Sequence, residues 1–441
     1  MTLYKHILMN RTYQTLLLLF FSSSLLWAQQ TPASSQNKSI LILGATAHIG
    51  DGTVIENSAI GFENGKLTLV STEATISQNF DRTISAEGMH VYPGFIAANA
   101  TLGLVEISAV RATNDADDIG AFLPHVRSII AYNAESKIVE SVRPNGVLIA
   151  QITPRGGTIS GKSSIVQLDA WNWEDAALRV DDGIHLNWPN PYKRGRWWLG
   201  EDPTIKENDA YQKDVRTIHD FMGKAQAYLQ SKPKKKDLPA EAMRGVFEGS
   251  QAVYLHANDE KQIVDAVSYL KNLGIEKVVL IGGNDAHLQA RFLKEHDVAV
   301  VISRPHRLPA MEDQDIKLPF KMAHLLMEAG LTVSIDTSGR MERMNTRNLP
   351  FYAGSFAAYG VPKEKAVQMI TGNAAKILGV EDRMGTLAVG KDATLFISEG
   401  DALDMRSNQL THAFIQGREI SLETHQTKLW KRYSEKYASE E

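Results

Sequence analysis

The chain has 441 residues, 43% of them hydrophobic, which is enough apolar material for one large domain and a smaller one. Its 47 basic residues are outnumbered by 51 acidic ones, and this balance argues against a nucleic-acid partner. Cysteine is absent, which excludes disulfides, thiolate zinc ligands and a cysteine nucleophile.

The first 28 residues have the pattern of a cleaved signal peptide. Lys5 and Arg11 form a basic start, residues 16–21 are an apolar run, and small residues follow. A membrane anchor is the alternative, but the apolar run is well short of the roughly 20 residues that span a bilayer. We therefore expect a periplasmic or secreted protein with a poorly ordered leader over residues 29–38 and no membrane span after cleavage.

The elements that follow the leader are β-strands. Residues 39–44 are an apolar run that ends at a glycine, as in a buried strand. Residues 58–62 and 66–70 flank Asn64-Gly65, and an Asn-Gly pair between two strand-like runs is a strong hairpin signal. The far end of the chain has a similar character, with strands expected at 390–397, 410–415 and 419–422.

The middle of the chain alternates strand-like and helix-like segments, which is the pattern of a parallel α/β architecture. Its clearest unit is a strand at 252–256 and a helix that Asn258 or Asp259 caps and Gly274 ends. The strands and helices expected after this unit lie at 277–281, 285–296, 298–302, 318–329, 331–335, 349–359 and 362–370.

The most informative motif is Pro93-Gly94-Phe95-Ile96-Ala97-Ala98-Asn99-Ala100-Thr101-Leu102-Gly103. It resembles the first-strand motif of the amidohydrolase superfamily, Pro-Gly-Phe-Ile-Asp-Ala-His-x-His-x-Gly. A second stretch, Lys391-Asp392-Ala393-Thr394-Leu395, is similar to a mark of the family's C-terminal part, with threonine in place of an aspartate. The chain looks most like the imidazolonepropionase-like branch of this superfamily.

This resemblance implies a (β/α)8 TIM-type barrel, the metal-dependent hydrolase fold, over residues 91–384. Residues 39–90 and 385–425, from the two ends of the chain, would combine into a small β-sandwich domain. Residues 157–235 are the least family-like part, and we expect them to form an aromatic-rich insertion in the barrel.

The family binds its catalytic metal with residues at strand ends, and this chain keeps only part of that set. Asn99 and Thr101 stand where the first motif of the family has two metal-binding histidines. His256 matches the histidine of the fifth strand, and Asn284 replaces that of the sixth. Asp336 matches the final-strand aspartate, a metal ligand and proton shuttle. The resemblance therefore implies a vestigial or partial metal site at His256 and Asp336, with Asp336 as the candidate catalytic residue.

Two ligands are too few for catalytic zinc, which takes about three protein ligands and an open water position. Asparagine and threonine oxygens suit calcium or magnesium better. We therefore expect no cofactor, and an aspartate without a metal activates water poorly. His185 and His287 are candidate rescue ligands for zinc or another divalent ion, and Lys162 is a weak candidate for the family's bridging lysine. The alternative is structural, with His256 as a hydrogen-bonded core residue and Asp336 as a cap.

Five of the seven tryptophans lie between residues 171 and 198. Among them, Trp188, Trp197 and Trp198 are candidates for a ligand-binding rim at the barrel mouth, where they would stack on a ring, a sugar or a peptide. Packing of the expected insertion is the alternative, because tryptophan buries a large area at low entropic cost.

These observations lead to two hypotheses about function. The first is an exported amidohydrolase-family protein whose metal site is largely lost. Such a catalytically impaired barrel, or pseudoenzyme, would bind a small molecule, or pair with an active relative or a second copy of itself. The alternative is an active hydrolase of cyclic amide or peptide-like C–N bonds that uses an atypical mononuclear or metal-free site at His256 and Asp336.

Overall fold

In a computed structural model of the protein, residues 31–72, 78–231, 235–337 and 343–438 are described, and Ala33–Glu441 forms one compact unit. The expected signal peptide, residues 1–28, lies outside the described residues. Within the described part of the chain, we find no helix that is both long and apolar enough to cross a membrane.

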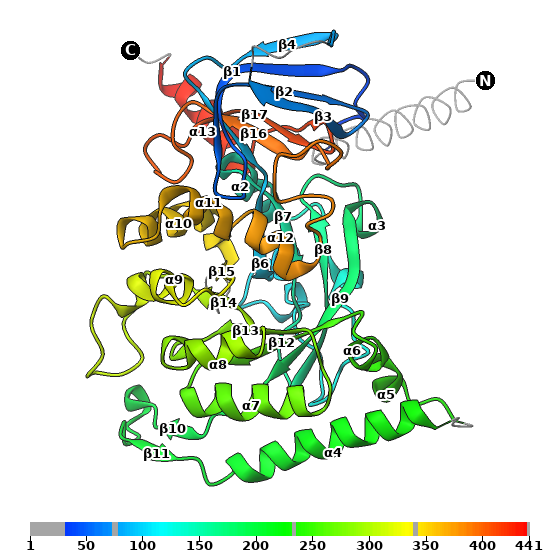
Figure 1. The fold of residues 1–441 in the computed structure, drawn as a ribbon, viewed down its shortest axis with the longest axis vertical. Coiled ribbons are helices and arrows are strands. Elements are labelled where there is room, and N and C mark those ends of the chain that lie inside the picture. Colours follow the sequence, from blue (N-terminus) through cyan, green and yellow to red (C-terminus); the bar gives the residue numbers. More distant parts are fainter. Residues whose placement is uncertain (1–30, 73–77, 232–234, 338–342, 439–441) are drawn as a thin grey trace, which may run out of the picture. The chain divides into compact units, whose positions relative to one another are not determined.

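A closed barrel of eight strands fills the middle of the chain (Figure 1). This architecture confirms the expected fold class, a mixed α/β barrel of the TIM type with an additional β-rich domain. In order around the barrel, the strands are β6 (Phe95–Ala100), β7 (Val147–Ile152), β8 (Ile159–Gln167), β9 (Ala177–Asn187), β12 (Ala252–Ala257), β13 (Val278–Gly282), β14 (Ala299–Ser303) and β15 (Val333–Asp336), which pairs with β6.

One strand departs from the all-parallel pattern of a (β/α)8 barrel. β8 runs antiparallel to both of its neighbours, β7 and β9. A parallel connection needs a crossover of about a dozen or more residues, whereas residues 153–158 alone join β7 to β8. The chain therefore turns back, and β8 begins at the end of the barrel where β7 finishes.

The segment 157–235 is also less of an insertion than expected. Its first part supplies β8 and β9 to the barrel wall. Only the later part lies outside the barrel strands, as a hairpin of β10 (Tyr192–Arg194) and β11 (Ile205–Glu207) followed by the long helix α4 (Tyr211–Gln230). Residues 157–235 therefore supply two barrel strands as well as a segment outside the barrel strands.

Helices alternate with strands from β12 onward, as predicted. Asp259 caps α7 (Glu260–Asn272) in a capping box with Gln262, and Ile263, Val267 and Leu270 are buried against the barrel. The predicted helix 285–296 begins with a 3-10 turn, η7 (Ala286–Gln289), before α8 (Ala290–Glu295). The later helices are α9 (Leu318–Glu328), α10 (Leu349–Ala358), α11 (Lys363–Met369), α12 (Gly372–Leu378) and α13 (His425–Ala438), and the shorter ones are α2 (Lys137–Val142), α3 (Trp173–Ala176), α5 (Leu238–Ala242) and α6 (Arg244–Phe247).

Strands from the two ends of the chain form one eight-stranded sheet. The predicted hairpin is confirmed, because β2 and β3 pair antiparallel and both Asn64 and Gly65 in the turn have positive φ. The strands from the N-terminal side are β1 (Ile40–His48), β2 (Val54–Glu63), β3 (Lys66–Thr72), β4 (Arg82–Ser85) and β5 (His90–Pro93), and those from the C-terminal side are β16 (Leu395–Ser398), β17 (Leu410–Ile415) and β18 (Arg418–Glu419).

The Pro-Gly-Phe motif joins this sheet to the barrel. The Gly94 amide donates to the Thr394 carbonyl at 2.9 Å, and the rings of Phe95 and Phe396 meet edge to face. A Cβ atom on Gly94 would lie 2.9 Å from the Thr394 methyl group, so a larger residue would force the two segments apart. The motif therefore has a packing reason that is independent of any metal.

Candidate functional site

The residues expected from the family resemblance at its ligand positions lie at the C-terminal ends of the barrel strands. Asn99 and His256 are each the second-to-last residue of their strands, β6 and β12, and Asp336 is the last residue of β15. Thr101 directly follows β6, and Asn284 follows β13. Because barrel enzymes carry their sites at this end, we take the mouth around Asn99, His256 and Asp336 as the candidate site.

An arginine that the sequence analysis missed lies at this mouth. Arg155 follows β7, and its Nη1 donates to Asn99 Oδ1 at 2.9 Å while its Nη2 donates to the Asn99 carbonyl at 2.7 Å. Burial lowers the pKa of Arg155 to about 10, although the negative charge of Asp336 opposes the shift. Arg155 therefore stays protonated at neutral pH, and its charge faces Asp336. The only sequence signal is its position just after a strand-like run.

The backbone at Asn99 is shaped for this contact. Its φ is 51°, in the left-handed region that asparagine tolerates better than most residues, and its side chain is buried. The Asn99 amide donates to Gln151 Oε1 at 3.0 Å, so both the main chain and the side chain of this residue are bonded. Asparagine here holds an arginine, which a protonated histidine could not do without charge repulsion.

His185 and His256 meet on the opposite side of the mouth. Nδ1 of His185 lies 2.9 Å from Nε2 of His256, so one ring nitrogen donates and the other accepts. Burial lowers the pKa of His256 to about 3, and the positive charge of Arg155 adds to the shift. The pKa of the fully buried His185 is also lowered, first by burial and then by the charges of His256 and Arg155. Both imidazoles are therefore neutral at pH 7.

A buried polar network lies between these two groups. Asp182 accepts hydrogen bonds from Tyr254 OH at 2.6 Å, from Ser163 Oγ at 2.7 Å and from Gln151 Nε2 at 2.8 Å. Gln151 in turn reaches Asn99, and the Tyr254 ring stacks on His185 with 4.7 Å between centroids. Burial raises the pKa of Asp182, and its three hydrogen bonds oppose the shift. Through Gln151 and Tyr254, the network therefore positions Asn99 and His185 at the mouth.

The donor set does not fit the family's catalytic metal. Among the described residues, no three or more His, Asp or Glu side chains are grouped so that they could hold an ion. Asn99 Oδ1 already accepts a hydrogen bond from the Arg155 guanidinium, and Nε2 of His256 is hydrogen-bonded to Nδ1 of His185. A divalent cation beside Arg155 would also meet like charge, which a low-dielectric site penalises strongly.

The remaining candidate ligands do not join this group. His287 lies in the 3-10 turn η7, where its half-buried ring is close to the charges of Asp285 and Glu260. Lys162 is in β8, half-buried beside Asp181 and Arg127, and burial lowers its pKa. Of the two rescue ligands proposed from the sequence, His185 therefore reaches His256, whereas His287 sits among carboxylates outside the mouth.

The three candidate rim tryptophans have different surroundings. Trp188 is buried, and its indole nitrogen donates to Tyr211 OH at 3.2 Å, so it packs β9 against α4 rather than offering a rim surface. Trp198 is 64% exposed in the turn η6 (Trp197–Leu199). The side chain of Trp197 lies outside what the structure describes.

A rim cavity of about 470 Å³ lies beside the mouth, between the β10–β11 hairpin and the loops after β12 and β13. Tyr192 and Arg194 line it from the hairpin, and Asp259, Asn284 and Asp285 line it from the loops. Burial raises the pKa of Asp285, and a hydrogen bond from Gln314 opposes the shift. The cavity combines apolar, aromatic and charged groups within the volume range of small-molecule sites.

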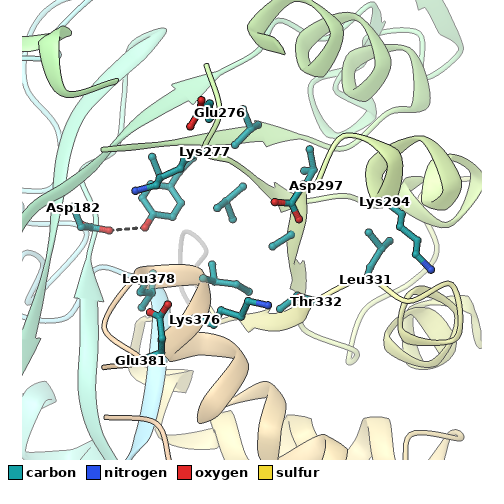
Figure 2. A pocket seen from close by; sticks show the side chains of 18 of the residues that line it. Asp182, Glu276, Lys277, Lys294, Asp297, Leu331, Thr332, Lys376, Leu378 and Glu381 are labelled. Atoms are coloured by element: carbon teal, nitrogen blue, oxygen red, sulfur yellow. Dashed lines mark hydrogen bonds between the residues drawn. The ribbon is translucent and has the colours of Figure 1, made fainter. Parts of the chain in front are cut away.

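A second cavity, of about 300 Å³, opens at the other end of the barrel (Figure 2). It is lined by the first residues of β12, β13 and β14 and by the end of α12, and the hydrogen bond between Asp182 and Tyr254 lies at its wall. Side chains at the N-terminal end of barrel strands usually serve stability. We therefore place the functional site at the mouth and not in this cavity.

Comparison with known proteins agrees with this architecture. Residues 250–420 match the sequence model of the Amidohydrolase family. Among solved structures, an amidohydrolase from Thermotoga maritima MSB8 has a TM-score of 0.73 at 21% identity, covering 86% of this chain and 99% of that one. The structure of molinate hydrolase has a TM-score of 0.55 at 14% identity, and the match covers 89% of this chain and 96% of that one.

An adenosine deaminase from Xanthomonas campestris with bound zinc has a TM-score of 0.52 at 16% identity, covering 86% of this chain and 92% of its own. No curated protein matches the sequence. The family match and these likenesses together support the amidohydrolase superfamily, and they show its barrel fold.

Proposed function

We propose that this protein is an amidohydrolase-superfamily barrel, of the imidazolonepropionase-like branch, whose metal site has been replaced and which binds a small molecule rather than hydrolysing one. The observation that carries the proposal is the position of Arg155. Its guanidinium donates twice to Asn99, at the first ligand position, and faces the charge of Asp336 at the last. We infer that this permanent side-chain cation takes the place of the metal cation that the family's chemistry needs.

The surrounding substitutions are consistent with this exchange of charge. A metal site favours anionic or neutral electron-pair donors, and Asn99 supplies an oxygen that suits a hydrogen-bond donor such as arginine. Arg155 cannot release a proton to its surroundings or polarise a bound water as zinc does. Asp336 therefore lacks the activated water that it would have to deprotonate.

The rim cavity beside Asn284 is where we propose that the ligand binds. Its volume of about 470 Å³ accommodates a small molecule, and Tyr192 offers a ring for stacking next to carboxylates at Asp259 and Asp285. A ring or peptide-like compound with hydrogen-bond donors matches this lining.

We further propose that the N-terminal segment exports the protein to the periplasm or beyond the cell, and that it acts as a homo-oligomer or with an active relative. The basic start and short apolar run of residues 1–28 support export.

The second candidate function is hydrolysis of a cyclic amide or peptide-like C–N bond at His256 and Asp336. It is favoured by the neutral state of His256 at the mouth, since a neutral imidazole can accept a proton. The same low pKa, about 3, makes His256 a weak base at neutral pH, which places this function second. It predicts that Asp336→Asn abolishes hydrolysis of such amides.

Elemental analysis of the protein purified without chelator tests the proposal. We expect much less than one zinc, manganese or iron ion per chain, before and after incubation with each metal. About one ion per chain that is lost in His256→Ala would overturn the proposal and favour the hydrolase. His412→Ala is the matched control, because that half-buried histidine lies in β17 of the sheet, far from the mouth in sequence and fold.

A further inference from the structure

The last helix, α13, carries a row of exposed aromatic side chains. Trp430 is 72% exposed, Tyr433 49% and Tyr437 57%. Their spacing of three and four residues places the three rings on one face of the helix, with the half-buried Leu429 beside them. Three large rings together on one solvent-facing surface indicate an interaction site.

The rest of the helix surface is basic. Residues 425–438 contain four Lys or Arg residues and one acid, a net charge of +3 from 4 minus 1, in a chain whose overall net charge is −4. The four cations are Lys428, Lys431, Arg432 and Lys436, all exposed. A basic helix with aromatic residues on one face is typical of helices that lie on membrane surfaces.

Two of these cations are held next to the aromatic row. The guanidinium of Arg432 lies 4.9 Å from the centroid of the Tyr433 ring and donates to its hydroxyl at 3.2 Å. The ammonium of Lys436 lies 4.9 Å from the centroid of the Tyr437 ring. Each pair presents a ring and a positive charge together, which suits the boundary between acyl chains and anionic headgroups.

The start of α13 is fixed to the body of the protein. The His425 amide donates to Glu140 Oε1 of α2 at 2.6 Å. Glu140 is itself buried, so the helix begins on a rigid support and projects its aromatic row outward. Figure 1 shows α13 as the last element of the chain, close to α2.

We propose that α13 docks the protein on an anionic lipid surface, with Trp430, Tyr433 and Tyr437 inserted at the headgroup level and the basic side chains toward lipid phosphates. Charge complementarity selects this occupant over a second copy of the chain, because two α13 helices would bring +3 against +3. An acidic protein partner is the competing occupant, and it would be favoured if the parent protein failed to sediment with anionic vesicles.

The test is cosedimentation of Ala33–Glu441, the compact unit with its own core, with lipid vesicles. We expect binding to vesicles of phosphatidylglycerol mixed with phosphatidylcholine, and about tenfold weaker binding to phosphatidylcholine alone. The triple variant Trp430→Ala, Tyr433→Ala, Tyr437→Ala should bind the anionic vesicles about tenfold more weakly, since it removes the inserted area. Trp171→Ala, which removes a 63% exposed tryptophan elsewhere, is the matched control and should bind like the parent.

A second variant isolates the charge. Lys431→Glu, Arg432→Glu and Lys436→Glu together should abolish binding to anionic vesicles while leaving the circular dichroism spectrum unchanged. The proposal is overturned if the parent does not sediment with the anionic vesicles, or if the aromatic variant binds them as well as the parent does. It is also overturned if the aromatic variant converts a dimer to a monomer in sedimentation equilibrium, because α13 would then pair with another copy.

Discussion

Two buried ionisable side chains, one inside the barrel and one at its mouth, are held in different ways. Asp182, inside, is surrounded by three neutral donors, which satisfy it as a structural residue must be satisfied. Arg155, at the mouth, donates twice to Asn99 and once to the Pro154 carbonyl, and it faces the opposite charge of Asp336. The interior network thus serves stability, whereas at the mouth we propose that the charge balance between Arg155 and Asp336 replaces one made by a metal.

The largest expected effect comes from breaking the interior network. Asp182→Ala removes the acceptor of three hydrogen bonds. The buried hydroxyls of Tyr254 and Ser163 lose that acceptor, and Gln151 Nε2 keeps only its bond to Ser163 Oγ. We expect the free energy of unfolding to fall by about 3 kcal/mol or more, measured by urea denaturation. Asp209→Ala, at an exposed carboxylate paired with Lys193, should change it by less than about 0.5 kcal/mol. A loss below about 1 kcal/mol in Asp182→Ala would show that the network is not structural.

A smaller loss is expected at the mouth. Arg155→Ala removes the charge that faces Asp336 and both donors to Asn99, and should destabilise the protein by about 1–3 kcal/mol. Arg155→Lys keeps the charge but not the paired donors, so it should recover part of the loss. Arg291→Ala, at a 93% exposed side chain, is the matched control and should be nearly neutral. Equal stability of all three variants would remove Arg155 from the charge balance of the mouth.

How much of this comparison could be read from the sequence depends on the kind of interaction. The strand ends at Asn99, His256, Asn284 and Asp336 were predictable, because a motif and a hydrophobic run locate each of them. The antiparallel direction of β8 was not, since it depends on a short connection rather than on a residue pattern. Arg155 was missed for a similar reason, because its partners Asn99 and Asp336 are distant in the sequence and only the closed barrel brings them together.

The smallest expected effect is a difference in stability between variants of the buried Trp188 and the exposed Trp198. Trp188→Phe loses buried contact area and the hydrogen bond to Tyr211, and should cost about 1–2 kcal/mol. Trp198→Phe, at an exposed ring, should change stability by less than about 0.5 kcal/mol. Both are measured by denaturation under the same conditions. The reverse order would place Trp188 at the rim after all.

The measurement that tests the central account most directly is zinc binding by restored variants. Asn99→His, Thr101→His and Asn284→His return the family's ligands, and the same triple variant with Arg155→Ala also removes the competing cation. Isothermal titration calorimetry of the two proteins should show about one zinc per chain only in the variant without Arg155. Zinc uptake that is equal with and without Arg155 would contradict the view that this arginine has taken the place of the metal.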